Sequence, residues 1–221
     1  MKPLPWSHST LEAVKTCPKQ FYHVKVAKDV KETFNYMRDW GSRAHKAIEV
    51  ALKGDGVLES EFQSYQWYVD TLVAFQGQKM VEHKLGIAKD YGKIGFFDKD
   101  VWARCVIDYL VVKDNKALIV DHKMGKKKPS KQLTQNALLV FHNYPDVKVC
   151  YTSFSWLNED VRDATNKVHT RDEVPELWAG YENDLCTYNR AFEEELWVPK
   201  PSGLCNGWCP VTSCQYWREK R

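Results

Sequence analysis

Two short apolar runs separated by a polar turn stand out in the middle of the chain. Residues 106–112 and 117–123 are rich in Val, Ile, Leu and Tyr, which suit a pleated, half-buried strand. Lys113-Asp114-Asn115-Lys116 lies between them, and Asp and Asn tolerate the backbone of tight hairpin turns. The pattern therefore predicts a β-hairpin.

The turn sets the register of this hairpin. If Asp114 and Asn115 are the loop residues, Asp108 faces Asp121, with Cβ atoms about 5 Å apart. Lys123 shares the side of Asp121, because side chains alternate along a strand. Two converging carboxylates suit Mg²⁺ or Mn²⁺, and with an amine they form the apparatus of metal-assisted hydrolysis. The alternative is a polar outer face whose acids happen to oppose.

The remaining pattern predicts an α/β fold with a mixed central β-sheet flanked by helices. Helices are expected over about 9–16, 41–52, 58–76, 130–142 and 175–196, with a further helical piece opening at Pro18, and strands over 79–88 and 146–157. We expect a single domain, 1–221, made of a helical part (1–78), a sheet core (79–160) and a C-terminal helix with a Cys-rich tail (171–221).

Composition excludes several classes of protein. A hydrophobic fraction of 43% with 13% aromatic residues excludes global disorder. The net charge of +3 is too small to indicate a nucleic-acid partner by itself. The chain shows neither a signal-peptide pattern nor an apolar run of the ~18 residues that a membrane span needs. We expect a cytoplasmic protein without a membrane partner, in the host cytoplasm if phage-encoded.

Cysteine spacing indicates a possible second site. Cys205, Cys209 and Cys214 lie within ten residues, and in a reducing compartment such clusters suggest a metal or cluster site rather than disulfides. The other cysteines besides Cys17 are isolated in apolar surroundings, which is typical of buried small hydrophobic residues. They are Cys105, Cys150 and Cys186.

Several polar residues can be interpreted either as functional residues or as ordinary structural or surface residues. His45 lies at the edge of an apolar helical stripe, where it is a ligand or a partly buried structural histidine. Gln132 and Asn136 lie one helical turn apart, on a face that either serves the site or faces solvent. A lysine-rich loop next to the hairpin would contact phosphate or is a solvated surface loop. Its lysines are Lys123, Lys126, Lys127, Lys128 and Lys131.

Taken together and in order, these motifs resemble the PD-(D/E)XK nuclease superfamily. The resemblance is closest to the branch that contains the RecB nuclease domain, the Cas4 exonucleases and bacteriophage exonucleases, and it spans nearly the whole chain. The motifs are Ser7-x-Ser9-x-Leu11 with Cys17-Pro18-x-x-Phe21-Tyr22, Gly41-x-x-x-His45, Asp108 with Asp121-His122-Lys123, Gln132-x-x-x-Asn136, and Cys205-x-x-x-Cys209-Pro210-x-x-x-Cys214.

The resemblance implies a role for each motif. Asp108, Asp121 and the His122 backbone carbonyl would bind Mg²⁺ or Mn²⁺, with His45 completing the shell and Glu82 reaching the metal through water. Lys123 would orient the attacking water. Gln132, Asn136 and the Lys126–Lys128 loop would hold DNA, although Asn136 stands where the family usually has tyrosine. Ile107 replaces the proline that often precedes the first acid.

The resemblance also implies that Cys17 joins the three C-terminal cysteines to hold a [4Fe–4S] cluster. Family members usually have two and five residues between the last three cysteines, whereas this chain has three and four. Zinc, which also accepts four thiolates, is the alternative.

The implied function is a metal-dependent DNA exonuclease, acting on duplex ends or single strands in phage recombination, replication or host DNA degradation. A recombination or single-strand-binding protein is a compatible partner, and an oligomer is compatible with processive digestion. Two other readings stay open. One is a Cas4-like or RecB-like subunit that is active only with its partner, and the other is a non-catalytic DNA-binding protein.

Overall fold

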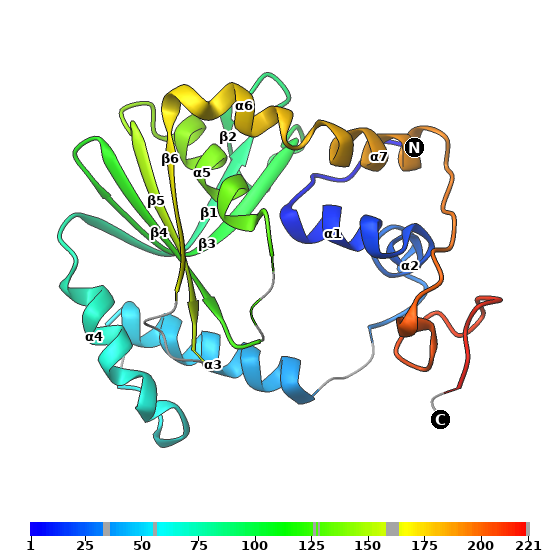
Figure 1. The fold of residues 1–221 in the computed structure, drawn as a ribbon, viewed down its shortest axis with the longest axis horizontal. Helices are drawn as coiled ribbons and strands as arrows, with labels where there is room; N and C mark the ends of the chain where they lie inside the picture. The colour runs from blue at the N-terminus through cyan, green and yellow to red at the C-terminus, as the bar shows by residue number, and fades with distance from the viewer. Residues whose placement is uncertain (33–35, 55–56, 126, 128, 158–163, 220–221) are drawn as a thin grey trace. The chain divides into compact units, whose positions relative to one another are not determined.

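The computed structural model describes residues 1–221 except 33–35, 55–56, 126, 128, 158–163 and 220–221 (Figure 1). The chain forms two compact units. Unit 1 combines residues 1–35 with 179–221, and unit 2 is residues 36–178. In the part of the chain that is described, no helix is long and apolar enough to cross a membrane.

Unit 2 contains a six-stranded mixed sheet in the order β2-β1-β3-β4-β5-β6. Only β4 and β5 pair in parallel, and the other neighbours are antiparallel. This confirms the expected mixed sheet. The strands are β1 (Gln78–Ile87), β2 (Lys93–Ile94), β3 (Ala103–Lys113), β4 (Lys116–Lys123), β5 (Val149–Trp156) and β6 (Thr165–Thr170).

Helices cover both faces of this sheet. The helices of unit 2 are α3 (Tyr36–Leu52), α4 (Gln66–Ala74), α5 (Gln132–Asn143) and α6 (Val174–Ala179), with short 3₁₀ turns at Ser60–Tyr65 and Arg171–Glu173. α3 and α4 share a core with Tyr109 and Val120 of the sheet. Leu133 of α5 packs instead on Phe154 and Trp156. Since Phe154 aligns with Asp121, the neighbour of Val120, α5 lies on the opposite face.

Unit 1 contains the two terminal parts of the chain. Its elements are α1 (His8–Thr16), α2 (Pro18–Phe21), a π-helix (Tyr22–Ala27), α7 (Glu182–Glu193) and a 3₁₀ turn (Gly203–Cys205). Ser7 caps α1 through its side chain, and Pro18 opens α2 at the position where its missing N–H is harmless. Aromatic side chains fill the core, where Phe21 lies 6.1 Å from both Tyr188 and Phe192, centroid to centroid.

The structure corrects three expectations about secondary structure. The single helix expected over 58–76 is a 3₁₀ turn (Ser60–Tyr65) followed by the shorter α4 (Gln66–Ala74). The single helix expected over 175–196 is split into α6 and α7 around Gly180 and Tyr181. Glycine is unfavourable inside a helix, and the Tyr181 ring packs on Trp6 at 5.7 Å. The pattern also missed β6, whose mostly polar sequence lacks a strand signature, and which forms only as an edge partner of β5.

Gly77, directly before β1, offers a test of this backbone. Its φ is 135°, and an added Cβ would lie 2.7 Å from the Val112 carbonyl oxygen. Gly77→Ala should lower the free energy of unfolding by at least about 2 kcal/mol, because strain and a backbone clash add. Urea unfolding measures this loss.

Gly54→Ala is the matched control. Gly54 also has a positive φ of 77°, but nothing lies within 4 Å of its added Cβ. Gly54→Ala should lower the free energy of unfolding only through the strain of a positive φ, by about 1–2 kcal/mol. Equal losses in the two variants would contradict the packing described around Gly77.

Candidate metal centre

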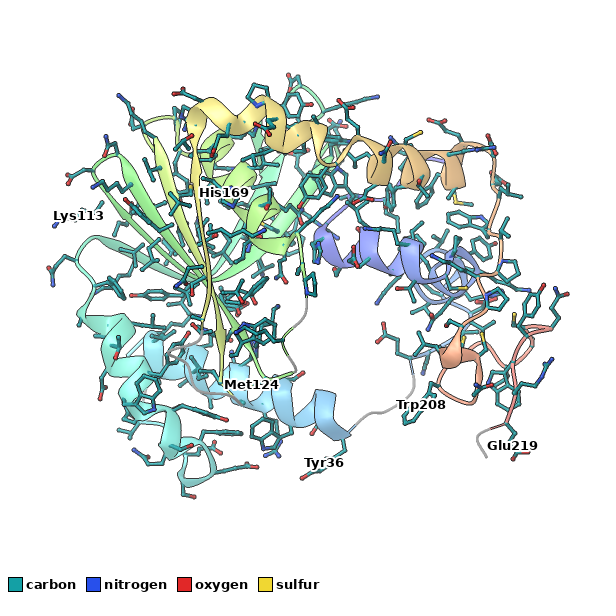
Figure 2. All side chains as sticks on the ribbon, in the orientation of Figure 1. Tyr36, Lys113, Met124, His169, Trp208 and Glu219 are labelled. Carbon is teal, nitrogen blue, oxygen red and sulfur yellow. The ribbon has the colours of Figure 1, made fainter. Side chains whose placement is uncertain are left out.

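The β3–β4 hairpin has the register expected from its turn. The pairs run from Lys113–Lys116 at the tip to Tyr109–Val120, and Asp114 at the turn has a φ of 52° (Figure 2 labels Lys113 at this tip). One step further, Asp108 Oδ2 accepts a hydrogen bond of 2.8 Å from the backbone N–H of His122. The first acid therefore lies directly against the strand that carries the second.

A third carboxylate joins from β1. Val81 pairs with Tyr109 and His83 with Ile107, so Glu82 lies across from Asp108. The φ of Glu82 is 52°, a conformation that non-glycine residues avoid and that concentrates at functional sites. The strain points to a constraint on where the Glu82 side chain must lie.

His45 of α3 completes a potential metal-binding group with these acids. One ligand atom each from His45, Glu82 and Asp108 lies within 4.8 Å of the others, and no second group of this kind occurs among the described His, Cys, Asp and Glu residues. His45 Nδ1 lies 3.6 Å from Asp108 Oδ2. Imidazole and carboxylate ligands together suit divalent ions such as Mn²⁺. These residues could hold a divalent metal.

The second acid lies in a hydrogen-bonded network with the amine. Lys123 Nζ lies 2.6 Å from Asp121 Oδ2 and donates to Gln132 Oε1 at 2.9 Å. The Gln132 amide in turn donates to Asp121 Oδ1. Asp121 is 1% exposed, so this network supplies the polar partners that a buried carboxylate needs. The predicted lysine, acid and glutamine are thus in direct contact.

The acids repel one another where they stand. Burial, then the charge of Asp121, raises the pKa of Asp108 well above its usual range. Burial also raises the pKa of Asp121, which Lys123 partly offsets, and that of Glu82. A divalent cation at this point would replace the missing water and neutralise the repulsion. The donor set therefore fits a hard cation.

The two histidines of the centre have different roles. Burial lowers the pKa of His45, which favours the neutral imidazole that a metal requires, and the His122 backbone hydrogen-bonds to this ring. Burial lowers the pKa of His122 to about 3, and its Nδ1 lies 2.7 Å from the Tyr68 hydroxyl. His122 thus turns its side chain into the core and its backbone toward His45.

Tyr68 is the residue that sequence reasoning missed. It lies on the apolar face of α4 and is 4% exposed. A tyrosine on such a face is indistinguishable from an ordinary core residue until its hydroxyl partner is known. Only the packing of α4 on the sheet brings it to His122.

The predicted DNA contacts have mixed outcomes. Asn136 is 1% exposed, because this part of α5 faces the core, so a direct contact between its amide and DNA was wrong. Gln132 is partly exposed and bonded to both Asp121 and Lys123. Lys127 is exposed, whereas Lys126 and Lys128 lie outside the described residues.

The four cysteines of the predicted second site lie around one pocket in unit 1. Cys17, Cys205, Cys209 and Cys214 all line it. Burial first, and then the neighbouring cysteines, raise the pKa of Cys209. Among the described residues, however, no three cysteine sulfurs lie within 4.8 Å of one another. A cluster or metal at this place is not shown.

Comparisons with known proteins support the fold. Neither a family model nor a curated protein matches the chain. Among solved structures, it is similar to the crystal structure of a "putative exonuclease" from Eubacterium rectale, with a TM-score of 0.52 and 12% sequence identity. The match covers 96% of this chain and 86% of the other. At this identity the similarity concerns the fold alone.

The repulsion at the centre predicts how stability depends on pH without metal. Because the pKa of Asp108 is raised in the folded state, the folded protein binds the proton of this carboxyl more tightly than the unfolded chain does. The resulting stabilisation of the fold is complete below the unfolded pKa of about 3.9 and is lost as the pH rises through the folded pKa. Asp108→Asn should therefore gain stability over the wild type between pH 4 and 8 in EDTA, by about 1 kcal/mol or more. Urea unfolding across pH measures the difference.

Asp114→Asn at the exposed hairpin turn is the control, since Asn also tolerates the positive φ found there. Its stability relative to the wild type should not vary with pH in this way. A pH-independent difference for Asp108→Asn would show that burial and repulsion do not raise the pKa of Asp108 in the folded protein.

Proposed function

We propose that this protein is a Mg²⁺- or Mn²⁺-dependent DNA exonuclease of the PD-(D/E)XK superfamily, close to the branch of RecB, Cas4 and phage exonucleases. One observation carries the proposal. His45, Glu82 and Asp108 gather within 4.8 Å, and the Asp121–Lys123 ion pair of 2.6 Å stands on the adjoining strand. A chance set of surface charges would not combine burial, backbone strain and this motif order.

The acids and His45 would hold the ion. Asp108, Asp121 and the His122 carbonyl would bind it, with His45 and Glu82 completing its shell. When bound, Mg²⁺ or Mn²⁺ would polarise the scissile phosphate and stabilise the charge that develops on it. The hydrogen bond from the His122 N–H keeps Asp108 in place for this task.

Lys123 would act on the attacking water. Its ammonium is held by Asp121 and Gln132, so it can orient a water and favour loss of its proton. Gln132 positions both groups and reaches the surface, where it would also contact the DNA backbone. Lys127, and with it Lys126 and Lys128, would add phosphate contacts that weaken with salt and carry little sequence preference.

The four cysteines would hold a structural [4Fe–4S] cluster that joins the chain ends. Four cysteines around one pocket supply the number of thiolates that either a [4Fe–4S] cluster or a single zinc ion takes, and we favour the cluster because the family resemblance implies it. Phosphodiester hydrolysis needs no redox step, so the cluster would support the fold.

A role in phage recombination, replication or host DNA degradation fits such an enzyme. The second candidate is a nuclease subunit that is active only with its partner. A non-catalytic DNA-binding protein is disfavoured, because it would have no need for the Asp108, Asp121 and Lys123 set.

The test is hydrolysis of end-labelled linear duplex and single strands with Mg²⁺, Mn²⁺ or EDTA. The wild type should degrade linear DNA only with a divalent ion and should spare closed circles. Lys123→Ala should lower the rate of hydrolysis about 10²- to 10⁴-fold while DNA binding persists. The substitution removes the ammonium that would orient the attacking water and favour loss of its proton. Lys116→Ala, at the exposed hairpin turn, is the charge-matched control and should keep full activity.

Full activity in Lys123→Ala would refute the mechanism. An inert wild type that binds DNA with any ion would favour a non-catalytic protein. Activity that appears only on addition of a partner protein would identify the subunit.

Anaerobic purification tests the cysteine site. We expect a brown protein with about four irons per chain, and Cys209→Ser should lose iron and thermal stability together. Cys186→Ser is the matched control and should retain both. Cys186 lies outside the pocket and is exposed, so the expectation that it is buried like Cys105 and Cys150 was wrong. A colourless protein with stoichiometric zinc would contradict the cluster.

A further inference from the structure

An exposed aromatic side chain lies among cations in the turn between β2 and β3. Phe97 is 77% exposed, and its ring packs edge-on against Phe96 at 4.9 Å. Lys84 Nζ lies 5.1 Å from the Phe97 ring centroid, and the Arg104 guanidinium lies 4.8 Å from that of Phe96. An apolar face open to solvent is thus bordered by two positive charges from neighbouring strands.

The turn that carries Phe97 is firmly held. Asp98 donates its N–H to the Gly95 carbonyl at 3.0 Å, and its side chain accepts from the Asp100 N–H at 3.0 Å. Gly86 of β1 permits this close approach, since a Cβ there would lie 3.0 Å from the Ile94 carbonyl oxygen. A ligand that stacks on Phe97 would therefore meet a pre-organised surface.

This cationic aromatic turn lies on the same side of the sheet as the first acid. Along β3, Arg104, Val106 and Asp108 alternate with three buried residues and so share one side of the strand. Lys84 pairs with Val106, and paired residues of an antiparallel ladder point the same way. Two residues along a strand span about 7 Å, so Lys84 lies beside the candidate metal centre.

We propose that Phe97, Lys84 and Arg104 form a binding site for single-stranded DNA beside the metal centre. A base stacks on the Phe97 ring, and the phosphates next to it contact Lys84 and Arg104. The site deepens the proposed function and rests on it for the identity of the ligand.

The chemistry of the turn favours this ligand over an apolar partner. Stacking of a base on an aromatic side chain contributes about 1–3 kcal/mol and tolerates any sequence, and cations beside the ring attract the backbone. An apolar protein surface would instead have to desolvate both cations without pairing them. The Asp98 carboxylate accepts the Asp100 N–H within its own turn rather than pairing with either cation.

Binding of a short oligonucleotide in EDTA tests the site without hydrolysis. Fluorescence anisotropy should show Phe97→Ala binding a labelled single strand about 5- to 100-fold more weakly, with Phe97→Trp close to the wild type. A strand containing 2-aminopurine should be quenched by the wild type but not by Phe97→Ala. Lys84→Ala should reduce the slope of the logarithm of the binding constant against the logarithm of the salt concentration by about one.

Phe75→Ala is the matched control, because Phe75 is also an exposed phenylalanine of unit 2, at 42%. Unchanged affinity in Phe97→Ala, an equal loss in Phe75→Ala, or a wild type that binds no single strand would each overturn the proposal. Since these assays contain no divalent ion, they are separate from the hydrolysis assay, whose failure would refute the proposed function alone.

Discussion

Repulsion between buried carboxylates is the constraint on which the rest of unit 2 depends. Asp108, Asp121 and Glu82 come from three adjacent strands. Burial raises the pKa of all three carboxylates, and the charge of Asp121 raises the pKa of Asp108 and of Glu82 further. A fold keeps such an arrangement only if something else requires it. The strained backbone of Glu82 supports this interpretation, because a relaxed strand would turn the third carboxylate elsewhere.

The surrounding elements hold this centre from both faces of the sheet. On one face, α3 supplies His45 and α4 supplies Tyr68, which hydrogen-bonds to the buried His122 side chain. On the other face, α5 supplies Gln132, which ties Asp121 to Lys123. The strand that carries Asp121 is therefore fixed by side chains that point into opposite cores. Such support keeps ligand groups in place before any ligand arrives.

Local patterns predicted the parts of the fold that local chemistry decides. The turn residues Asp114 and Asn115 specified the hairpin register, and apolar periodicity located α1, α5 and β1 within one or two residues. Prediction from the sequence failed for segments whose structure depends on other elements packed or paired against them. β6 has no strand pattern of its own and exists through pairing with β5, and Asn136 reads as a surface amide although α5 buries it. The single domain expected from length stays a prediction.

The amino-acid sequence by itself determined which chemical groups are available, their order, and the register that brings Asp108 toward Asp121, because turn geometry and strand alternation act over a few residues. Only the tertiary structure decided that Glu82 joins the centre through a strained backbone, that Gln132 bridges Asp121 and Lys123, and that His122 turns inward to Tyr68. These contacts join residues on different elements, some more than fifty positions apart. Their energies come from burial and packing, which no local window of the chain contains.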